Sequence, residues 1–108
     1  MVIDLRIEEG DKRIKVFPLL AKSFPEHWAP RIARGRNSFP FKVVSVIAEC
    51  KGIVVGHCGI FVFEFYLAGR RKKAAGLCAV AVDPDYQRIG IAGRMCDHVF
   101  KYCRERRI

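Results

Sequence analysis

The sequence predicts a single α/β domain, of the α+β type, in which helices flank a sheet. Its length of 108 residues suits one small domain with a buried core. Its composition, 51% hydrophobic and 29% charged, is typical of a packed globular protein. Along the chain, the apolar residues switch between the two-residue period of strands and the spacing of helices. We therefore expect one domain that spans residues 1–108.

The N-terminal part predicts one strand followed by two short helices. Residues 2–8 alternate between apolar and polar side chains, as a half-buried strand does. Over residues 12–35 the apolar side chains recur at helical spacing, but Pro18, Pro25 and Pro30 forbid one continuous helix. We expect two helices, the second of which begins at or near Pro25.

A long hairpin is predicted next. The runs Val43–Cys50 and Ile53–Leu67 are rich in Val, Ile and Phe, and the turn Lys51-Gly52 separates them. A glycine inside a strand often marks a bulge, so the longer strand is expected to carry one near Gly56 or Gly59.

The last elements are a strand and an amphipathic helix. A charged turn over residues 68–73 leads into the almost entirely apolar run 74–82, which predicts a central strand buried on both faces. Asp83-Pro84-Asp85 ends this strand. An apolar stripe then predicts a helix packed on the sheet, formed by Ala92, Met95, Cys96, Val99, Phe100 and Cys103.

Charge and cysteine content restrict the class of partner and the compartment. Twenty basic residues against 11 acidic ones give a net charge of +9, clustered over 70–73 and 104–107, which favours an anionic partner. No apolar run is long enough to span a bilayer and the start does not resemble a signal peptide, so we expect a soluble, cytoplasmic protein. The five cysteines form no CxxC pair, so we expect buried, reduced thiols and no metal.

The connection between the last strand and the helix predicts an anion site. The first N–H groups of a helix lack partners within the helix and lie at its positive end, so those of Arg88 to Ala92 can converge on a phosphate. Gly90 leaves room for a ligand beside the backbone. The alternative is purely structural, since many α/β proteins contain such a turn without a phosphate ligand. Neither a GxxxxGKS/T loop nor a GxGxxG turn is present.

The segment AVAVDPDYQRIGIAGRM resembles the acetyl-CoA-binding motif of the GNAT superfamily of N-acyltransferases. In that motif a strand ending in V-x-P-x-Y/F continues as Q/R-x-x-G-x-G/A, a pattern that Gln87, Arg88, Gly90 and Ala92 match. The resemblance implies a mixed, largely antiparallel sheet with flanking helices. VVGHCGI, the basic turn and the AVAV strand are also similar to the branch of aminoglycoside N-acetyltransferases and nodulation-type acyltransferases. Cys78 departs from the former, where a carboxylate is expected.

The resemblance implies a set of site residues. Acetyl-CoA, or another acyl-CoA, is the implied cosubstrate, and the implied binding residues are Val80, Ala81, Val82, Gln87, Arg88, Ile89, Gly90, Ile91, Ala92 and Gly93. The backbone N–H of Val80 would polarise the thioester carbonyl. Glu64 is a candidate base, and His57 and Tyr66 are further candidates on the same strand, although a structural role is the alternative for all three.

The resemblance also implies that the fold is truncated after the motif helix and lacks the usual C-terminal strands. The exposed sheet edge could then support a homodimer. The leading hypothesis is transfer of an acetyl group to a small-molecule or peptide amine, by this chain or by a longer protein of which it is the cofactor-binding part. The alternatives are a non-catalytic scaffold with this fold and a small basic nucleic-acid-binding domain. No aromatic-basic interleaving or known motif supports nucleic acid, and no membrane partner is expected.

Overall fold

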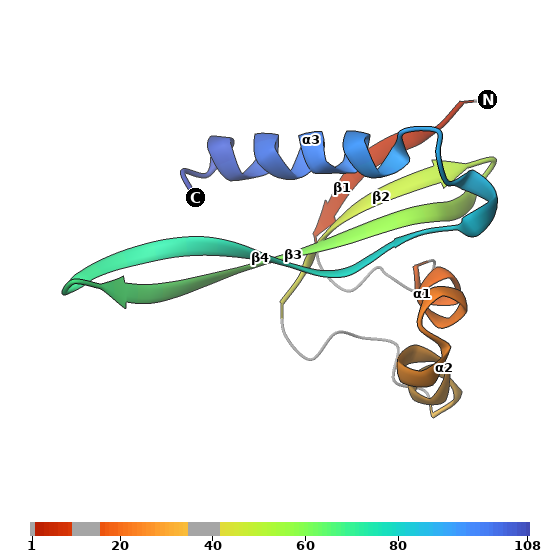
Figure 1. Ribbon diagram of the computed structural model, residues 1–108, viewed down its shortest axis with the longest axis horizontal. Helices are drawn as coiled ribbons and strands as arrows, with labels where there is room; N and C mark the ends of the chain where they lie inside the picture. Colours follow the sequence, from red (N-terminus) through yellow and green to blue (C-terminus); the bar gives the residue numbers. More distant parts are fainter. Residues whose placement is uncertain (1, 10–15, 35–41) are drawn as a thin grey trace.

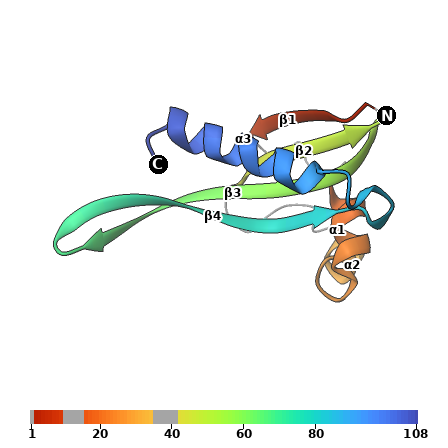
Figure 2. The ribbon, with the colours of Figure 1, turned by 45° about the horizontal axis from the view of Figure 1, so that its top comes forward.

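The computed structural model describes residues 2–9, 16–34 and 42–108 (Figure 1). Its strands form one antiparallel sheet in the order β1-β2-β3-β4, so each strand pairs with the next one along the chain. Helix α3 covers one face of this sheet, and α1 and α2 cover the other (Figures 1 and 2). The elements are β1 (Asp4–Glu9), α1 (Phe17–Ser23), α2 (Pro25–Ala33), β2 (Val44–Cys50), β3 (Ile53–Leu67), β4 (Arg70–Val82), the 3-10 helix η1 (Pro84–Tyr86) and α3 (Ile91–Glu105).

The larger core lies between α3 and the sheet. From the helix it receives Ile91, Met95, Val99 and Tyr102, and from the sheet mainly alternate residues of β2 and the inner half of β3. Gly56 lets the helix approach closely, because a Cβ at that position would lie 3.1 Å from Cγ2 of Ile91 and 3.2 Å from Sδ of Met95. This close packing fixes the position of α3 on the sheet, and with it the position of the helix N-terminus.

The smaller core lies on the opposite face, under α1 and α2. Phe17 and Trp28 pack with ring centroids 5.2 Å apart, and they cover Ile47, Val54 and Ala81 of the sheet. Two short helices, the second beginning at Pro25, confirm the prediction drawn from the prolines. Residues 10–15, where the predicted helical region began, lie outside the described residues.

The position predicted for the strand over 74–82 was wrong. β2 is the strand buried on both faces, while β4 lies at the edge of the described sheet. β4 also begins at Arg70, so the basic residues 70–73 belong to a strand instead of a turn. The run from Ala74 is rich in Ala, Gly and Cys, and such small side chains have little surface to bury in either position. Apolar character alone therefore did not separate a central strand from an edge strand.

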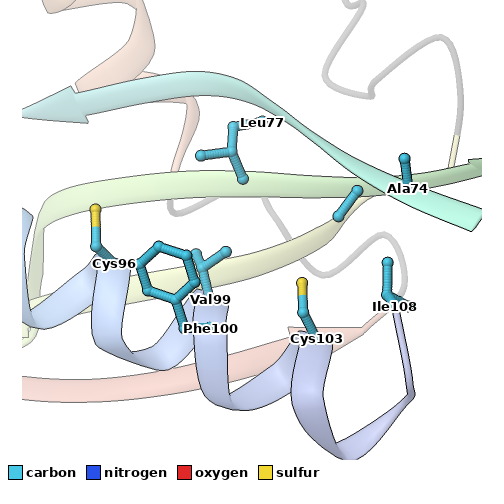
Figure 3. A pocket seen from close by; sticks show the side chains of 8 residues that line it. Ala74, Leu77, Cys96, Val99, Phe100, Cys103 and Ile108 are labelled. Carbon is cyan, nitrogen blue, oxygen red and sulfur yellow. The ribbon is translucent and has the colours of Figure 1, made fainter.

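The outer halves of β3 and β4 form a two-stranded arm that extends beyond the helices (Figures 1 and 2). Beside its base, an apolar groove of about 330 Å³ lies between β4 and α3, with Leu77 on one side and Phe100 on the other (Figure 3). The predicted helical stripe is thus shifted. Met95 and Val99 are buried as expected, but Phe100 is 64% exposed and Tyr102 takes its place in the core. None of the described helices is long and apolar enough to span a membrane.

Two glycines give opposite expectations for stability. A Cβ at Gly59 would lie 2.7 Å from Sγ of Cys78 and 2.8 Å from Cγ1 of Val43, so Gly59→Ala should lower the free energy of unfolding by about 1–3 kcal/mol. A Cβ at Gly93 of α3 would meet nothing within 4 Å, so Gly93→Ala should raise it by about 0.5–1 kcal/mol. Urea unfolding of both variants measures the contrast, and equal stabilities would contradict the packing described for β3.

Candidate cofactor site

An extra residue in β4 interrupts its pairing with β3. His57 pairs with Ala81 and Gly59 pairs with Cys78, so two residues of β4 lie opposite Cys58 alone. The first of these two, Ala79, has a φ of +50°. This left-handed conformation costs a non-glycine residue about 1–2 kcal/mol. Such bulges often occur at sites where a strand must turn a backbone or side-chain group toward a ligand.

A buried histidine of β3 contacts the bulge. The Nδ1 atom of His57 lies 2.8 Å from the carbonyl oxygen of Ala79, and Nε2 lies 2.8 Å from the hydroxyl oxygen of Ser45. His57 and Ser45 are both fully buried. Both ring nitrogens of His57 are thus engaged inside the sheet, which leaves the ring unable to face an acceptor.

The turn after β4 is held by Asp83. Its carboxylate accepts a hydrogen bond of 3.0 Å from the N–H of Asp85, which caps η1, and pairs with Nζ of Lys22 in α1 at 3.1 Å. The bond from the Asp85 N–H lowers the pKa of Asp83, and Lys22 lowers it further. Asp83 also donates its own N–H to the carbonyl of Val55 at 2.7 Å. These contacts tie the turn to both β3 and α1.

The N-terminus of α3 is open beside this turn. Gly90 caps the helix with a φ of +85° and no side-chain hydrogen bond, and Arg88 is also left-handed at +67°. The first hydrogen bond of the helix runs from the N–H of Arg94 to the carbonyl of Gly90, so the N–H groups of residues 91–93 have no partner inside the helix. A hollow of about 210 Å³ lies here, lined by Val82, Tyr86, Gln87, Arg88, Gly90, Ile91 and Ala92. A Cβ at Gly90 or Gly93 would meet nothing within 4 Å.

The two halves of the predicted cofactor site therefore lie together. Because the N–H of Asp83 points toward β3, the N–H and carbonyl groups of Val82 point to the outer edge of β4. The side chain of Gln87 donates to that Val82 carbonyl at 3.2 Å, which joins the strand edge to the loop before α3. Val80 is 48% exposed on the same strand.

The candidate bases on β3 lie elsewhere. Glu64 pairs in register with Lys73 on the arm and forms an ion pair of 3.0 Å with Arg71. Lys73 precedes Val80 by seven positions, so Glu64 is roughly 20 Å from the bulge along the strand. Tyr66 is still nearer the tip and is 73% exposed. The structure does not bring these side chains to Val80, and the role of Glu64 as a base stays a prediction.

The cysteines do not form a second reactive centre. Among the residues that the structure describes, the five cysteines form no disulfide, and no group of His, Cys, Asp or Glu could hold a metal ion. Cys50 and Cys58 are buried as expected, whereas Cys96 is exposed. Burial raises the pKa of Cys58 to about 11, which keeps its thiol protonated at neutral pH. The neighbouring Cys50 raises the pKa of Tyr86.

The fold and site together define a small α+β domain in which an exposed strand edge meets an open helix N-terminus. A family model of the acetyltransferase (GNAT) domain matches residues 6–108. The chain therefore belongs to the GNAT acetyltransferase family, as the motif over β4 and α3 predicted. No curated protein sequence matches this chain.

Solved structures share this fold at low sequence identity. A conserved protein of unknown function from Enterococcus faecalis gives a TM-score of 0.84 at 13% identity, and the match covers 100% of this chain but only 28% of that protein. An aminoglycoside N-acetyltransferase in complex with CoA gives a TM-score of 0.72 at 18% identity, covering 97% and 71% of the two chains. A predicted acetyltransferase from Clostridium acetobutylicum, with acetyl-CoA, gives 0.71 at 15% identity, covering 99% and 77%.

Three features of the site were not predicted from the sequence. The bulge was expected on β3, and β3 does carry an irregularity near Gly56, but the extra residue beside the site belongs to β4. The bond from His57 to Ser45 and the pair formed by Lys22 and Asp83 join residues 12 and 61 positions apart. Only the apolar surroundings of His57 in VVGHCGI signalled that this side chain is buried.

The stability contribution of Asp83 should depend on pH. Its folded pKa lies below its ordinary value of about 3.9, so the unfolded chain binds the proton more tightly and the carboxylate stabilises the fold above that value. Asp83→Ala should lower the free energy of unfolding by about 1 kcal/mol at pH 7 through loss of the cap. For Asp83→Asn, the difference from the wild type should be constant above about pH 5 and shrink as the pH falls toward 3.

Denaturant unfolding at several pH values measures this effect. Lys22→Met is the matched control, because it removes the ion pair and keeps the bond to the Asp85 N–H. It should therefore lower the free energy of unfolding less than Asp83→Ala does. A difference between wild type and Asp83→Asn that does not change between pH 6 and pH 3 would show that the carboxylate is not stabilised by the fold.

Proposed function

We propose that this domain binds acetyl-CoA and transfers its acetyl group to the amine of a small molecule or peptide. The observation that carries this proposal is the continuity between the outer edge of β4 and the open N-terminus of α3, joined by Gln87. A strand edge can pair with the amide groups of pantetheine, and a helix N-terminus can bind the pyrophosphate. The two occur here in the order in which those parts occur in acetyl-CoA.

The residues present fit this ligand. The N–H groups of Ile91, Ala92 and Gly93 would bind the pyrophosphate, and the Arg88 guanidinium would add a positive charge. Open space beside Gly90 and Gly93 allows phosphate oxygens to approach the backbone. Val82 would pair with the pantetheine arm, and the remaining loop and strand residues, Ala81, Gln87 and Ile89, would complete the site.

The chain can promote the reaction chiefly by polarising the bound thioester. Acetyl-CoA supplies an activated acyl group, whose carbonyl carbon forms a bond to the amine nitrogen while its bond to sulfur breaks. The N–H of Val80 would donate a hydrogen bond to the carbonyl oxygen, where negative charge develops. One proton leaves the amine and one is taken up by the thiolate.

Three of the similar structures support the donor and the class of acceptor. The matched aminoglycoside enzyme is described as an N-acetyltransferase in complex with CoA, and the Clostridium acetobutylicum protein contains acetyl-CoA. A glucosamine-6-phosphate N-acetyltransferase from Arabidopsis thaliana has the same fold, with a TM-score of 0.63 at 18% identity. Acetyl-CoA with an amino sugar is accordingly the first pair to assay.

A charge placed at the helix N-terminus tests the cofactor site. Ala92 is exposed in the first turn of α3, so Ala92→Glu should put a carboxylate where the pyrophosphate binds and weaken acetyl-CoA binding by about tenfold or more. The same carboxylate should leave the fold intact, because acidic residues stabilise helix N-termini. Isothermal titration calorimetry measures both affinities.

Ala92→Gln is the control, since it has nearly the same shape without the charge and should bind much more tightly than Ala92→Glu. Equal affinity of the two variants would place the pyrophosphate elsewhere. A folded wild-type chain that does not bind acetyl-CoA would refute the proposal for this chain and favour the scaffold alternative.

A further inference from the structure

The buried pair of His57 and Ser45 has no part in the cofactor contacts above. In the sheet register His57 lies between Ile47 of β2 and Ala81 of β4, both of which pack under α1 and α2. The imidazole therefore projects to the face that α1 and α2 cover. Polar side chains buried this deeply need hydrogen-bond partners of defined geometry, because a buried polar group without a partner lowers the stability of the fold.

The contacts of His57 fix which ring nitrogen carries a hydrogen. A carbonyl oxygen can only accept, so the 2.8 Å contact with the Ala79 oxygen requires a hydrogen on Nδ1. Full burial disfavours the charged ring, which leaves Nε2 as an acceptor for the Ser45 hydroxyl at 2.8 Å. Ser45 thus selects the form of the ring that donates to Ala79.

This donor determines the orientation of one peptide group. The peptide between Ala79 and Val80 is planar and trans, so its carbonyl and its N–H point in opposite directions. The carbonyl of Ala79 is drawn toward His57, on the face of α1 and α2. The N–H of Val80 must then point away from that face, toward the side of the sheet on which α3 lies.

We propose that His57 is a positioning residue that aims the Val80 N–H at the thioester carbonyl of the acyl-CoA. It acts through the Ala79 carbonyl and touches neither the cosubstrate nor the acceptor. The bulge explains why such a residue is needed: Ala79 is held in a left-handed conformation that alanine disfavours, and the bond from His57 stabilises the peptide in that orientation. This inference rests on the proposed function.

Two isosteric variants separate the donor to Ala79 from the rest of the side chain. The amide nitrogen of Asn lies near the position of Nδ1, so His57→Asn should retain the bond to the Ala79 carbonyl and lose that to Ser45. The amide of Gln reaches near Nε2, so His57→Gln should retain a contact with Ser45 and lose the bond to Ala79. Both variants bury a neutral amide, so their stabilities should be similar.

The first readout uses the protein without cosubstrate. Nitrogen-15 NMR of the wild-type imidazole should show a protonated Nδ1 and an unprotonated Nε2. The chemical shift of the Val80 amide should stay as in the wild type in His57→Asn and should change in His57→Gln. A wild-type ring protonated on Nε2 alone would overturn the proposal even if neither variant folds, because Nδ1 could not then donate to Ala79.

The second readout compares acetyl-CoA with CoA, which lacks the thioester carbonyl. His57→Gln should lose about 3- to 10-fold of affinity for acetyl-CoA, the worth of one hydrogen bond, with little change for CoA. His57→Asn should retain the preference of the wild type. An unchanged ratio of the two affinities in His57→Gln overturns the proposal. If the wild type binds neither molecule, the proposed function fails, and the NMR measurements still decide whether His57 orients the peptide.

Discussion

The site depends on one irregularity, the extra residue of β4 opposite Cys58. In an uninterrupted ladder, the backbone N–H and carbonyl groups of successive β4 residues would point alternately toward β3 and away from it. The peptide after Ala79 would then lie in the plane of the sheet. In the orientation we propose, the bulge turns that peptide out of the plane at a conformational cost of about 1–2 kcal/mol for Ala79. A buried hydrogen bond from His57 offsets a comparable amount, about 1 kcal/mol.

The other half of the site depends on small side chains and a fixed helix. Gly56 lets α3 lie directly on β3, while Gly90 and Ala92 keep its N-terminus open. The same helix is therefore packed tightly along its buried face, while the N–H groups of its first turn stay open to a ligand. The contact between Lys22 and Asp83 holds the intervening turn against α1, so both faces of the sheet take part in positioning one binding edge.

Much of the fold could be predicted from local patterns, because the period of the apolar residues and the prolines act over short distances. The bounds of β3 and the start of α2 at Pro25 follow directly from those signals. The family was also predictable, since the motif residues are contiguous in the sequence.

What the sequence did not reveal depends on register. Ser45, His57 and Ala79 meet only because three strands pair with one particular offset, and no local pattern specifies that offset. The edge position of β4 was missed because its small residues suit either environment.

The simple order of the sheet also bears on how the site forms. Every strand pairs with its neighbour in sequence, and β3 and β4 are joined by a turn of only two residues, Ala68 and Gly69. Closing so short a loop costs little chain entropy, which favours early pairing of this hairpin during folding. Pairing that begins at the tip reaches the bulge only after the arm has formed. His57 and Ala79 lie on the same hairpin, so their contact can form as the hairpin pairs, whereas Ser45 joins them only when β2 adds to the sheet.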